Sequence, residues 1–394
     1  MNEDNLLIET AEGLEKLVHR LKDADAIGVD TEFHSEKRYR AELFLIQISD
    51  RKGCIAVDPL AVKDLSPLKE IFAAEKPVKV FHSARNDIEI LAHVLQMRLR
   101  SVYDTQLAGA FIGAGEQTSL SKLISSISGK SPRKGHTLSD WSVRPLSADQ
   151  LEYALNDVRY LLEIYDSQMS RLTSSDRLHW YRAEAESLTD PSSYGVSTER
   201  LFRKARSAGK VRKSGLPYLW AMIQWREKVA MDLDKPRNFI MKDYVLAAVA
   251  AMQPTRLDSL QRLRGISSGF LDRWGKEILK VIADTRAAPP SDVPDISRQH
   301  AQPGVSARKK VLQIFLAQES DRLGIASSLL LPGELLDRVA ADPPSSLDEL
   351  HAVSGVSGWR TEALGADLVA LLRGELALCL KPGRHAGLKF VRLR

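Results

Sequence analysis

The sequence contains only two cysteines, Cys54 and Cys379, and they lie far apart in a chain of 394 residues. Two distant cysteines give no basis for a disulfide framework or a cysteine-rich zinc site. The chain has no run of about 18 apolar residues, so we expect no membrane span. Its first ten residues, MNEDNLLIET, are acidic and lack the basic and apolar regions of a signal peptide. We therefore expect a cytoplasmic chain with no membrane partner.

The front half of the chain has no excess of positive charge. Residues 1–195 have a net charge of −6, whereas residues 196–394 have a net charge of +11. The length predicts two or three domains. The asymmetry indicates a polyanionic partner that binds the back half, although a surface that is basic only for solubility would give the same totals.

The stretch Ala26–Phe33 reads as a buried strand with two carboxylates. Side chains alternate between the two faces of a strand, so Asp30 and Glu32 point the same way. Adjacent carboxylates on an apolar strand repel each other unless a cation lies between them. A hard divalent ion such as Mg²⁺, which prefers oxygen ligands, would fill that role. Alternatively, the two acids reach solvent at the end of the strand.

Further short apolar stretches predict strands at 43–49, 54–58, 78–82 and 101–105. Asp87 falls in the first turn of the helix that follows the strand at 78–82, where an acid also suits the helix dipole. Asp104 precedes another helix and is expected to cap it. Ser147 and Gln150 form a capping-box pattern before a helix at 148–169.

On this late helix, Tyr153 and Asp157 are four residues apart and project from one face. Taken alone, they could be incidental surface residues. Taken with Asp30, Glu32 and Asp87, they resemble the DEDD exonuclease superfamily, in the subgroup with Tyr-x-x-x-Asp as its last motif. The surrounding sequence is similar to the ribonuclease D family, in the segments VDTEF, FHSARNDIEIL and SDWSVRPLSADQLEYALNDVRYLLEIY.

The resemblance implies an RNase H-like α/β exonuclease domain, with a mixed central sheet flanked by helices. It implies two Mg²⁺ or Mn²⁺ ions and no nucleotide cofactor. The implied ligands are Asp30, Glu32, Asp87 and Asp157, and Tyr153 would position and help deprotonate the attacking water. Two ions can stabilise both the attacking and the leaving oxygen of a phosphodiester. None of the nine histidines shows zinc spacing.

Phe33 follows the second carboxylate and could pack near a terminal base, or it could be a core residue. Trp141 and Arg144 lie in the loop before the last motif and could shape the site or contact phosphate. Residues 200–213 contain seven Lys and Arg and no acid, which predicts a phosphate-binding strip or a solvated linker. The strip residues that we single out are Arg203, Lys204, Arg206, Lys210, Arg212 and Lys213.

The back half contains an internal repeat. Residues 221–282, shifted by 90, align without a gap on 311–372. The matched positions include Leu257 with Leu347, Gly265 with Gly355, and Gly275 with Gly365. Each copy is similar to the helicase-and-RNase-D C-terminal (HRDC) domain, an all-α helical bundle that assists nucleic-acid binding.

The expected domains are a DEDD 3′–5′ exonuclease domain at 1–195, a first HRDC-like domain at 196–286, a proline-rich linker at 287–306, a second HRDC-like domain at 307–380 and a basic tail at 381–394. The resemblance implies a monomeric 3′–5′ exoribonuclease that trims RNA 3′ ends, with tRNA precursors as the substrate class, and releases 5′-nucleotides. Two alternatives stay open. One is a DNA exonuclease of the same superfamily, and the other is a catalytically idle nucleic-acid-binding protein.

Overall fold

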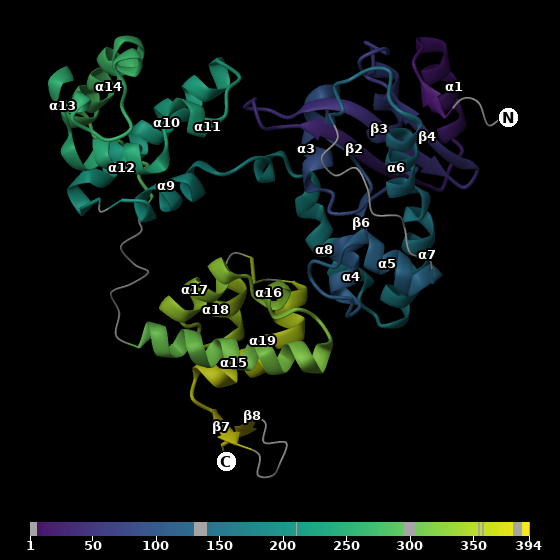
Figure 1. Ribbon diagram of the computed structural model, residues 1–394. Helices are drawn as coiled ribbons and strands as arrows, with labels where there is room; N and C mark the ends of the chain where they lie inside the picture. The colour runs from purple at the N-terminus through teal and green to yellow at the C-terminus, as the bar shows by residue number, and fades with distance from the viewer. Residues whose placement is uncertain are drawn as a thin grey trace. The chain divides into compact units, whose positions relative to one another are not determined.

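The computed structural model describes residues 6–129, 140–209, 211–294, 304–353, 355–356, 358–380 and 388–393 (Figure 1). The chain divides into two compact units. The first comprises Met1–Glu32, Phe44–Pro191 and Ser297–Arg394, and the second comprises Phe33–Leu43 and Ser192–Ile296. Within the described residues, no helix has both the length and the apolar character that a membrane crossing requires.

A mixed six-stranded sheet organises the N-terminal part of the chain. Its strands are β1 (Leu7–Ile8), β2 (Ala26–His34), β3 (Glu42–Asp50), β4 (Gly53–Val57), β5 (Val78–Phe81) and β6 (Val102–Asp104). Their order is β1-β4-β3-β2-β5-β6. β3 and β4 are antiparallel, whereas β1 pairs in parallel with β4, and β5 pairs in parallel with both β2 and β6. This arrangement confirms the expected mixed central sheet.

Helices accompany this sheet, as Figure 1 shows. They are α1 (Ala11–Leu21), α2 (Lys69–Phe72), α3 (Arg85–Leu95), α4 (Thr105–Phe111), α5 (Leu120–Ser128), α6 (Ala148–Arg159), α7 (Leu161–Ser174) and α8 (Leu178–Ala185). Short 3-10 turns lie at Ser66–Leu68, Glu186–Thr189 and Pro191–Ser193. The apolar faces of the helices are buried, for example Leu14 and Leu17 of α1. Burial of such faces is the main source of helix stability in a folded domain.

The single helix expected over 148–169 is two helices. α6 ends at Arg159 and α7 begins at Leu161, with Tyr160 between them at φ −108° and ψ 0°. The hydroxyl of Ser49 on β3 donates to the carbonyl oxygen of Val158 at 2.8 Å. The break therefore occurs where a strand side chain binds a helix carbonyl, a tertiary contact that helical periodicity does not reveal.

The second unit is helical apart from the segment Phe33–Leu43. Its helices are α9 (Thr198–Ser207), α10 (Leu216–Asp232), α11 (Arg237–Ile240), α12 (Asp243–Met252), α13 (Leu257–Gln261) and α14 (Ser268–Ala287), with a 3-10 turn at Lys213–Gly215. Its core includes Phe202 and Trp220, whose rings meet edge to face at 5.5 Å. These contacts join α9 to α10.

The helices after residue 304 repeat this pattern. They are α15 (Val305–Leu323), α16 (Ser327–Leu330), α17 (Gly333–Ala341), α18 (Leu347–Ala352) and α19 (Trp359–Leu372). α16 lies 90 positions after α11 at both ends, and α17 and α18 begin 90 positions after α12 and α13. Gly265 and Gly355 both have positive φ, +96° and +90°, which side chains rarely adopt.

The close approach between helices also recurs at this offset. A Cβ added at Gly275 would lie 2.7 Å from Leu257, and one added at Gly365 would lie 3.0 Å from Leu347. In both places a glycine lets one helix pack closely on a leucine of the preceding short helix.

Some sequence expectations fall partly outside the described residues. Lys210, residues 130–139 of the loop before α6, and residues 295–303 of the expected linker lie there. The segment 381–394, expected as a basic tail, contains the strand β8 (Leu388–Arg392). β8 pairs antiparallel with β7 (Leu376–Leu380), so this part of the segment is hairpin rather than tail.

Candidate active site

The two carboxylates of β2 meet a third from α6. Ligand oxygens of Asp30, Glu32 and Asp157 all lie within 4.8 Å of one another. Within the described part of the chain, these three residues form the only group of acids, histidines and cysteines with such spacing. Strand alternation brings Asp30 and Glu32 to one face, and α6 supplies Asp157 from far along the sequence.

α6 is held in place at its start and along its buried face. The Ser147 hydroxyl accepts from the Gln150 amide at 3.2 Å, and the Gln150 side chain accepts from the Ser147 amide at 3.0 Å, which confirms the expected capping box. Ala154, Leu155 and Val158 are buried. Tyr153 and Asp157 occupy another face of the same helix, where the Tyr153 hydroxyl hydrogen-bonds the Asp157 carboxyl.

A glycine on β2 lets α6 and α7 approach the sheet. A Cβ at Gly28 would lie 2.4 Å from the hydroxyl oxygen of Ser49, 3.0 Å from Leu161 and 3.2 Å from the carbonyl oxygen of Val158. Any side chain at this position would push the helices away. Gly28 is two residues from Asp30, and Val158 is adjacent to Asp157. The close approach of Gly28 to Val158 therefore sets the separation of the Asp30 and Asp157 carboxylates.

Asp87 belongs to α3, and its side chain contacts β2 at Thr31. The Thr31 hydroxyl donates to Asp87 Oδ1 at 2.5 Å, and both side chains are buried. Thr31 lies between the two acids in sequence, where the alternating pattern predicts the opposite face. Thr31 is not among the site residues that the sequence predicts. The available signal was a polar residue at a position expected to be apolar.

The turn before α3 is fixed by Asp104. Its carboxylate accepts from the Ser83 and Ala84 amides, each at 3.0 Å, and from the Gln106 amide at 2.8 Å. The predicted capping role of Asp104 at α4 is therefore confirmed. The same carboxylate also anchors the segment that leads to Asp87, a second role that the local sequence pattern does not show.

Arg144 makes contacts within the fold. Its guanidinium contacts both oxygens of Asp58, with Nε–Oδ2 at 2.5 Å and a second nitrogen 3.0 Å from Oδ1, and it also donates to the Phe44 and Trp141 carbonyls at 2.7 Å. Trp141 is buried against Phe44 and Leu155. These two residues tie the loop before α6 to β3 and to the end of β4.

Burial raises the pKa values of the four acids, and repulsion from the other acids raises those of Asp30 and Glu32 further. Burial raises the pKa of Asp30 well above its usual value, and Asp87, Asp157 and Glu32 raise it further. Burial, followed by repulsion from Asp157 and Asp87, raises the pKa of Glu32 to about 8. The pKa values of Asp87 and Asp157 rise to about 6, mainly through burial. A divalent cation would relieve this repulsion, so the donor set fits a hard metal ion.

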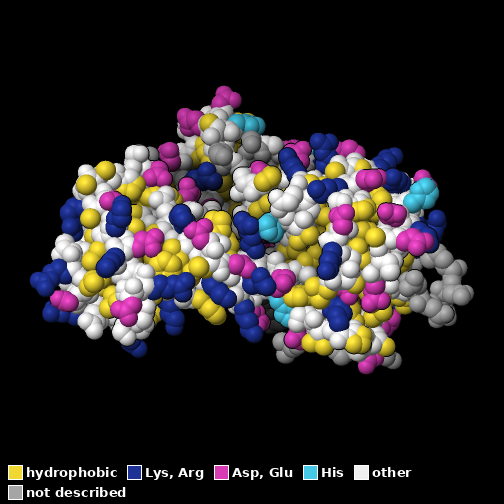
Figure 2. Space-filling view, turned by 90° about the horizontal axis from the view of Figure 1, so that it is seen from above, with side chains coloured by type: hydrophobic (Ala, Val, Ile, Leu, Met, Phe, Trp, Pro, Cys, Tyr) yellow, Lys and Arg dark blue, Asp and Glu magenta, His cyan; other side chains and the backbone are white. Residues whose placement is uncertain are grey.

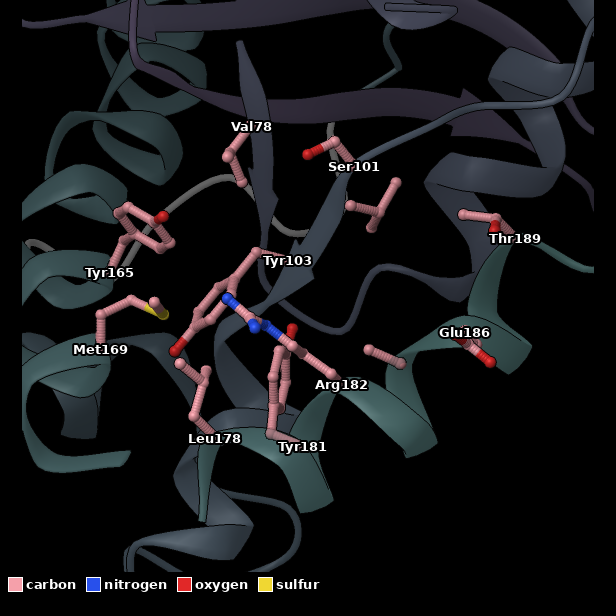
Figure 3. A pocket seen from close by; sticks show the side chains of 12 residues that line it. Val78, Ser101, Tyr103, Tyr165, Met169, Leu178, Tyr181, Arg182, Glu186 and Thr189 are labelled. Atoms are coloured by element: carbon pink, nitrogen blue, oxygen red, sulfur yellow. The ribbon is translucent and has the colours of Figure 1, made fainter. Parts of the chain in front are cut away.

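The cavity drawn in Figure 3, about 350 Å³ in volume, is separate from these acids. Its lining includes Tyr103, Tyr165 and Tyr181, together with Val78 at the start of β5. Val78 lies opposite Ala26, the first residue of β2. The cavity is therefore near the end of the sheet from which β2 starts, whereas Asp30 and Glu32 lie toward the other end of that strand.

The described residues expected to bind nucleic acid lie at the end of β2, on α9 and in the segment that follows α9. Phe33 is half-buried near the end of β2. Lys204 of α9 is exposed and lies 3.7 Å from Asp243, and Arg203 lies 3.8 Å from Glu199. The remaining described members of the strip are Arg206, which is half-buried, and Arg212 and Lys213, which are exposed. Figure 2 shows the distribution of Lys and Arg side chains over one face of the molecule.

The chain is similar to known proteins over most of its length. Residues 6–173 match a family model described as a 3′–5′ exonuclease, and residues 219–282 match the HRDC domain. The chain is 37% identical to ribonuclease D of Acidiphilium cryptum, over 96% of each chain. It is 35% identical to ribonuclease D of Gluconacetobacter diazotrophicus, over 95% of this chain and 94% of that protein.

The fold of the chain is also similar to that of a solved structure. The crystal structure of Escherichia coli RNase D, an exoribonuclease involved in structured RNA processing, matches with a TM-score of 0.82. The match has 28% sequence identity and covers 95% of this chain and 99% of that one. Ribonuclease D relatives match nearly all of the given sequence, and the mixed-sheet nuclease domain brings three acids together. The chain therefore belongs to the ribonuclease D family of metal-dependent 3′–5′ exoribonucleases.

Proposed function

We propose that this chain removes nucleotides from RNA 3′ ends by two-metal hydrolysis, with tRNA precursors as its substrate class, and releases 5′-nucleotides. The observation that supports this most is the cluster of Asp30, Glu32 and Asp157, with Asp87 held nearby by Thr31. Buried carboxylates that repel one another are unfavourable without a cation. Their arrangement is therefore best explained by a metal-binding function.

Asp30, Glu32, Asp87 and Asp157 would hold the ions, which can be Mg²⁺ or Mn²⁺. A bound pair of such ions would activate a water molecule and stabilise charge on the attacking and leaving oxygens. The four carboxylates offset much of the charge of the pair. Because they are all oxygen donors, they favour hard ions over zinc.

Tyr153 would position the attacking water. Its hydroxyl hydrogen-bonds Asp157, and burial, followed by the charges of Asp157, Glu32 and Asp30, raises its pKa well above the usual value. The hydroxyl is therefore protonated at neutral pH and can donate a hydrogen bond. Phe33, near the end of the strand that holds two of the acids, would pack against the terminal base.

RNA binding beyond the site would come from the back half of the chain. The strip comprising Arg203, Lys204, Arg206, Lys210, Arg212 and Lys213 would contact phosphates. We assign the helices α15–α19 to a second HRDC-like domain, supported by the 90-residue offset and the two matched glycine contacts. The proposed domains retain the expected boundaries 1–195, 196–286 and 307–380. We further propose a monomer that acts in the cytoplasm.

The test compares wild type with Asp30→Ala on 5′-labelled RNA and on DNA of the same sequence, with Mg²⁺ or with EDTA. The proposal expects a metal-dependent ladder that shortens from the RNA 3′ end and is lost in the variant. Equal degradation of DNA would favour a DNA exonuclease. A protein that binds RNA but does not cut it with either ion would be the idle binding protein instead.

The strip has a separate test. Replacing Arg203, Lys204 and Arg206 together by Gln should weaken RNA binding and flatten its dependence on salt, because fewer counterions are released. Cleavage of a dinucleotide should stay unchanged, since the strip is proposed to bind phosphates of the RNA and not to take part in the chemistry. An unaltered binding curve across salt would remove this role from the strip.

A further inference from the structure

Gln47 on β3 has a fully buried side-chain amide without a partner. The residue has no exposed surface, and within the described part of the chain neither Nε2 nor Oε1 has a hydrogen-bond partner. Gln168 on α7 is buried to the same degree, but its amide is satisfied. Gln168 Oε1 accepts from the Tyr103 hydroxyl at 3.3 Å, and its Nε2 donates to the Thr105 carbonyl at 2.9 Å. Buried polar groups are normally paired, so the amide of Gln47 requires an explanation.

The position of Gln47 in the sheet follows from a contact of Gly28. β2 and β3 are neighbours joined by a short loop over residues 35–41, and parallel neighbours would need a longer crossover, so the two strands are antiparallel. The Ser49 hydroxyl oxygen lies 2.4 Å from the position of a Cβ on Gly28. Diagonal neighbours are too far apart for such a contact, so Gly28 and Ser49 lie directly opposite each other.

The register places Gln47 beside an acid of the site. Two residues onward along β2 correspond to two residues backward along β3, so Asp30 lies opposite Gln47. Both side chains occupy the face on which α6 packs, because Ser49 on that face binds the Val158 carbonyl. Directly opposite residues have Cβ atoms about 4.5–5.5 Å apart, within reach of a glutamine amide.

The amide therefore has one ionisable neighbour across the strand pair, and that neighbour is a proposed metal ligand. Groups that hydrogen-bond a metal ligand fix its orientation, and their loss typically weakens metal binding about 10–100-fold. The Gln47 amide, which has no partner in the metal-free fold, can donate a hydrogen bond to the Asp30 carboxylate when that carboxylate is turned toward an ion.

We infer that Gln47 is a positioning residue for Asp30, whose Nε2 donates to the Asp30 carboxylate when that carboxylate holds a divalent ion. The inference rests on the proposed metal site and adds to it a neutral residue that touches neither ion nor RNA. In this role Gln47 holds Asp30 in the orientation that the ion requires, and it contributes no hydrogen bond to the metal-free fold.

The test substitutes Gln47→Met, which keeps the length of the side chain and removes the amide. Mn²⁺ binding is measured by calorimetry on the full chain, and the melting temperature is measured with EDTA and with Mn²⁺. We expect the melting temperature in EDTA to stay the same or rise, because no hydrogen bond is lost. We expect Mn²⁺ affinity to fall about 10–100-fold, with a smaller Mn²⁺-induced rise in melting temperature.

Gln168→Met is the matched control. It removes a buried amide whose partners are known, so it should lower the melting temperature in EDTA and leave the Mn²⁺ affinity at the wild-type value. A structural role for Gln47 would make the two variants behave alike. Gln47→Leu is the second variant for the same position, and a loss of folding in both Gln47 variants would also overturn the inference, since an unpartnered amide gives the metal-free fold no bond to lose.

The outcomes separate the inference from the function on which it rests. If wild type shows no response to Mn²⁺ in either measurement, the proposed metal site itself fails. If wild type responds and Gln47→Met binds Mn²⁺ equally well, the metal site stands and Gln47 has no positioning role.

Discussion

The hydroxyl of Thr31 donates to Asp87 Oδ1 at 2.5 Å, and this contact links β2, which carries Asp30 and Glu32, to α3, which carries Asp87. It also lowers the pKa of Asp87, against the larger effect of burial, which raises it. A threonine on the strand of Asp30 and Glu32 thereby holds the acid that comes from α3. The contact gives the most direct test of whether Asp87 belongs to the metal site.

Thr31→Val keeps the shape of the side chain and removes the donor. A hydrogen bond to a charged group contributes about 1.5–3 kcal/mol, so we expect Mn²⁺ affinity to fall about tenfold or more. Calorimetry at pH 7 measures the change. Thr31→Ser retains the hydroxyl and should bind Mn²⁺ close to the wild-type level. Equal losses in both variants would point to packing rather than to the hydrogen bond.

The pKa values of the acids predict how metal and pH act on stability. The folded-state pKa of Glu32 is about 8, and those of Asp87 and Asp157 are about 6. Unfolded carboxyls have pKa values of about 4. The folded protein therefore holds protons that the unfolded chain releases, and the contribution of these groups to stability is lost as pH rises from about 4 to 8.

A divalent ion replaces those protons, so it should stabilise the protein more at pH 8 than at pH 5.5. Melting temperatures with EDTA and with Mg²⁺ at both pH values measure this difference. Titration at pH 7 in two buffers of different ionisation enthalpy should show proton release on binding. A Mg²⁺ effect that is larger at pH 5.5 would contradict the assignment of these acids as ligands.

Tyr153→Phe removes the hydroxyl that hydrogen-bonds Asp157. If Tyr153 positions the attacking water, the cleavage rate at saturating RNA should fall about 100-fold or more, within the range for positioned proton-transfer groups. Mn²⁺ affinity should change little, because the four carboxylates remain. Rapid-quench measurement of a single turnover, alongside calorimetry, separates the two effects. A matched loss of affinity and rate would assign Tyr153 to ligand placement instead.

Gly28→Ala tests the packing that sets the distance between Asp30 and Asp157. The added Cβ would meet the Ser49 hydroxyl at 2.4 Å and Leu161 at 3.0 Å. Overpacking of this kind costs about 1–3 kcal/mol, measurable by urea unfolding. Gly28→Ala with Ser49→Ala removes the nearest clash and should recover part of the stability. No recovery in the double variant would place the strain at Leu161 and Val158.

Arg144→Ala leaves the buried carboxylate of Asp58 without its ion pair. Removing one partner of a buried pair costs about 3–5 kcal/mol, so urea unfolding should show a large loss of stability. Burial raises the pKa of Asp58, but the hydrogen bonds from Arg144 and from the backbone amides of Leu60 and Ala61, together with the charge of Arg144, outweigh it and keep the pKa below its usual value. The loss should therefore be smaller at pH 3.5 than at pH 7, because a protonated Asp58 needs no cation.

The sequence could predict features that depend on local rules. The alternation of β2 places Asp30 and Glu32 on one face, the Ser147–Gln150 pattern marks the start of α6, and Asp104 caps α4, as the structure confirms. In each case the deciding geometry lies within one strand or one helical turn.

Other features depend on residues brought together only by folding. The break at Tyr160 occurs where Ser49 binds the Val158 carbonyl, and the contacts of Arg144 converge on Asp58 from a separate part of the chain. In the first helical unit, Trp220 is buried, whereas Phe239 is 68% exposed. Helical spacing alone does not distinguish these two.

The order of the acids along the chain has a consequence for synthesis. Asp30 and Glu32 lie near the N-terminus, whereas Asp157 follows only on α6, after every strand of the main sheet. A chain emerging from the ribosome therefore lacks a complete set of carboxylates until α6 is available to pack over β2. Cleavage at the proposed site can therefore not begin before Asp157 has been synthesised and α6 has packed on the sheet.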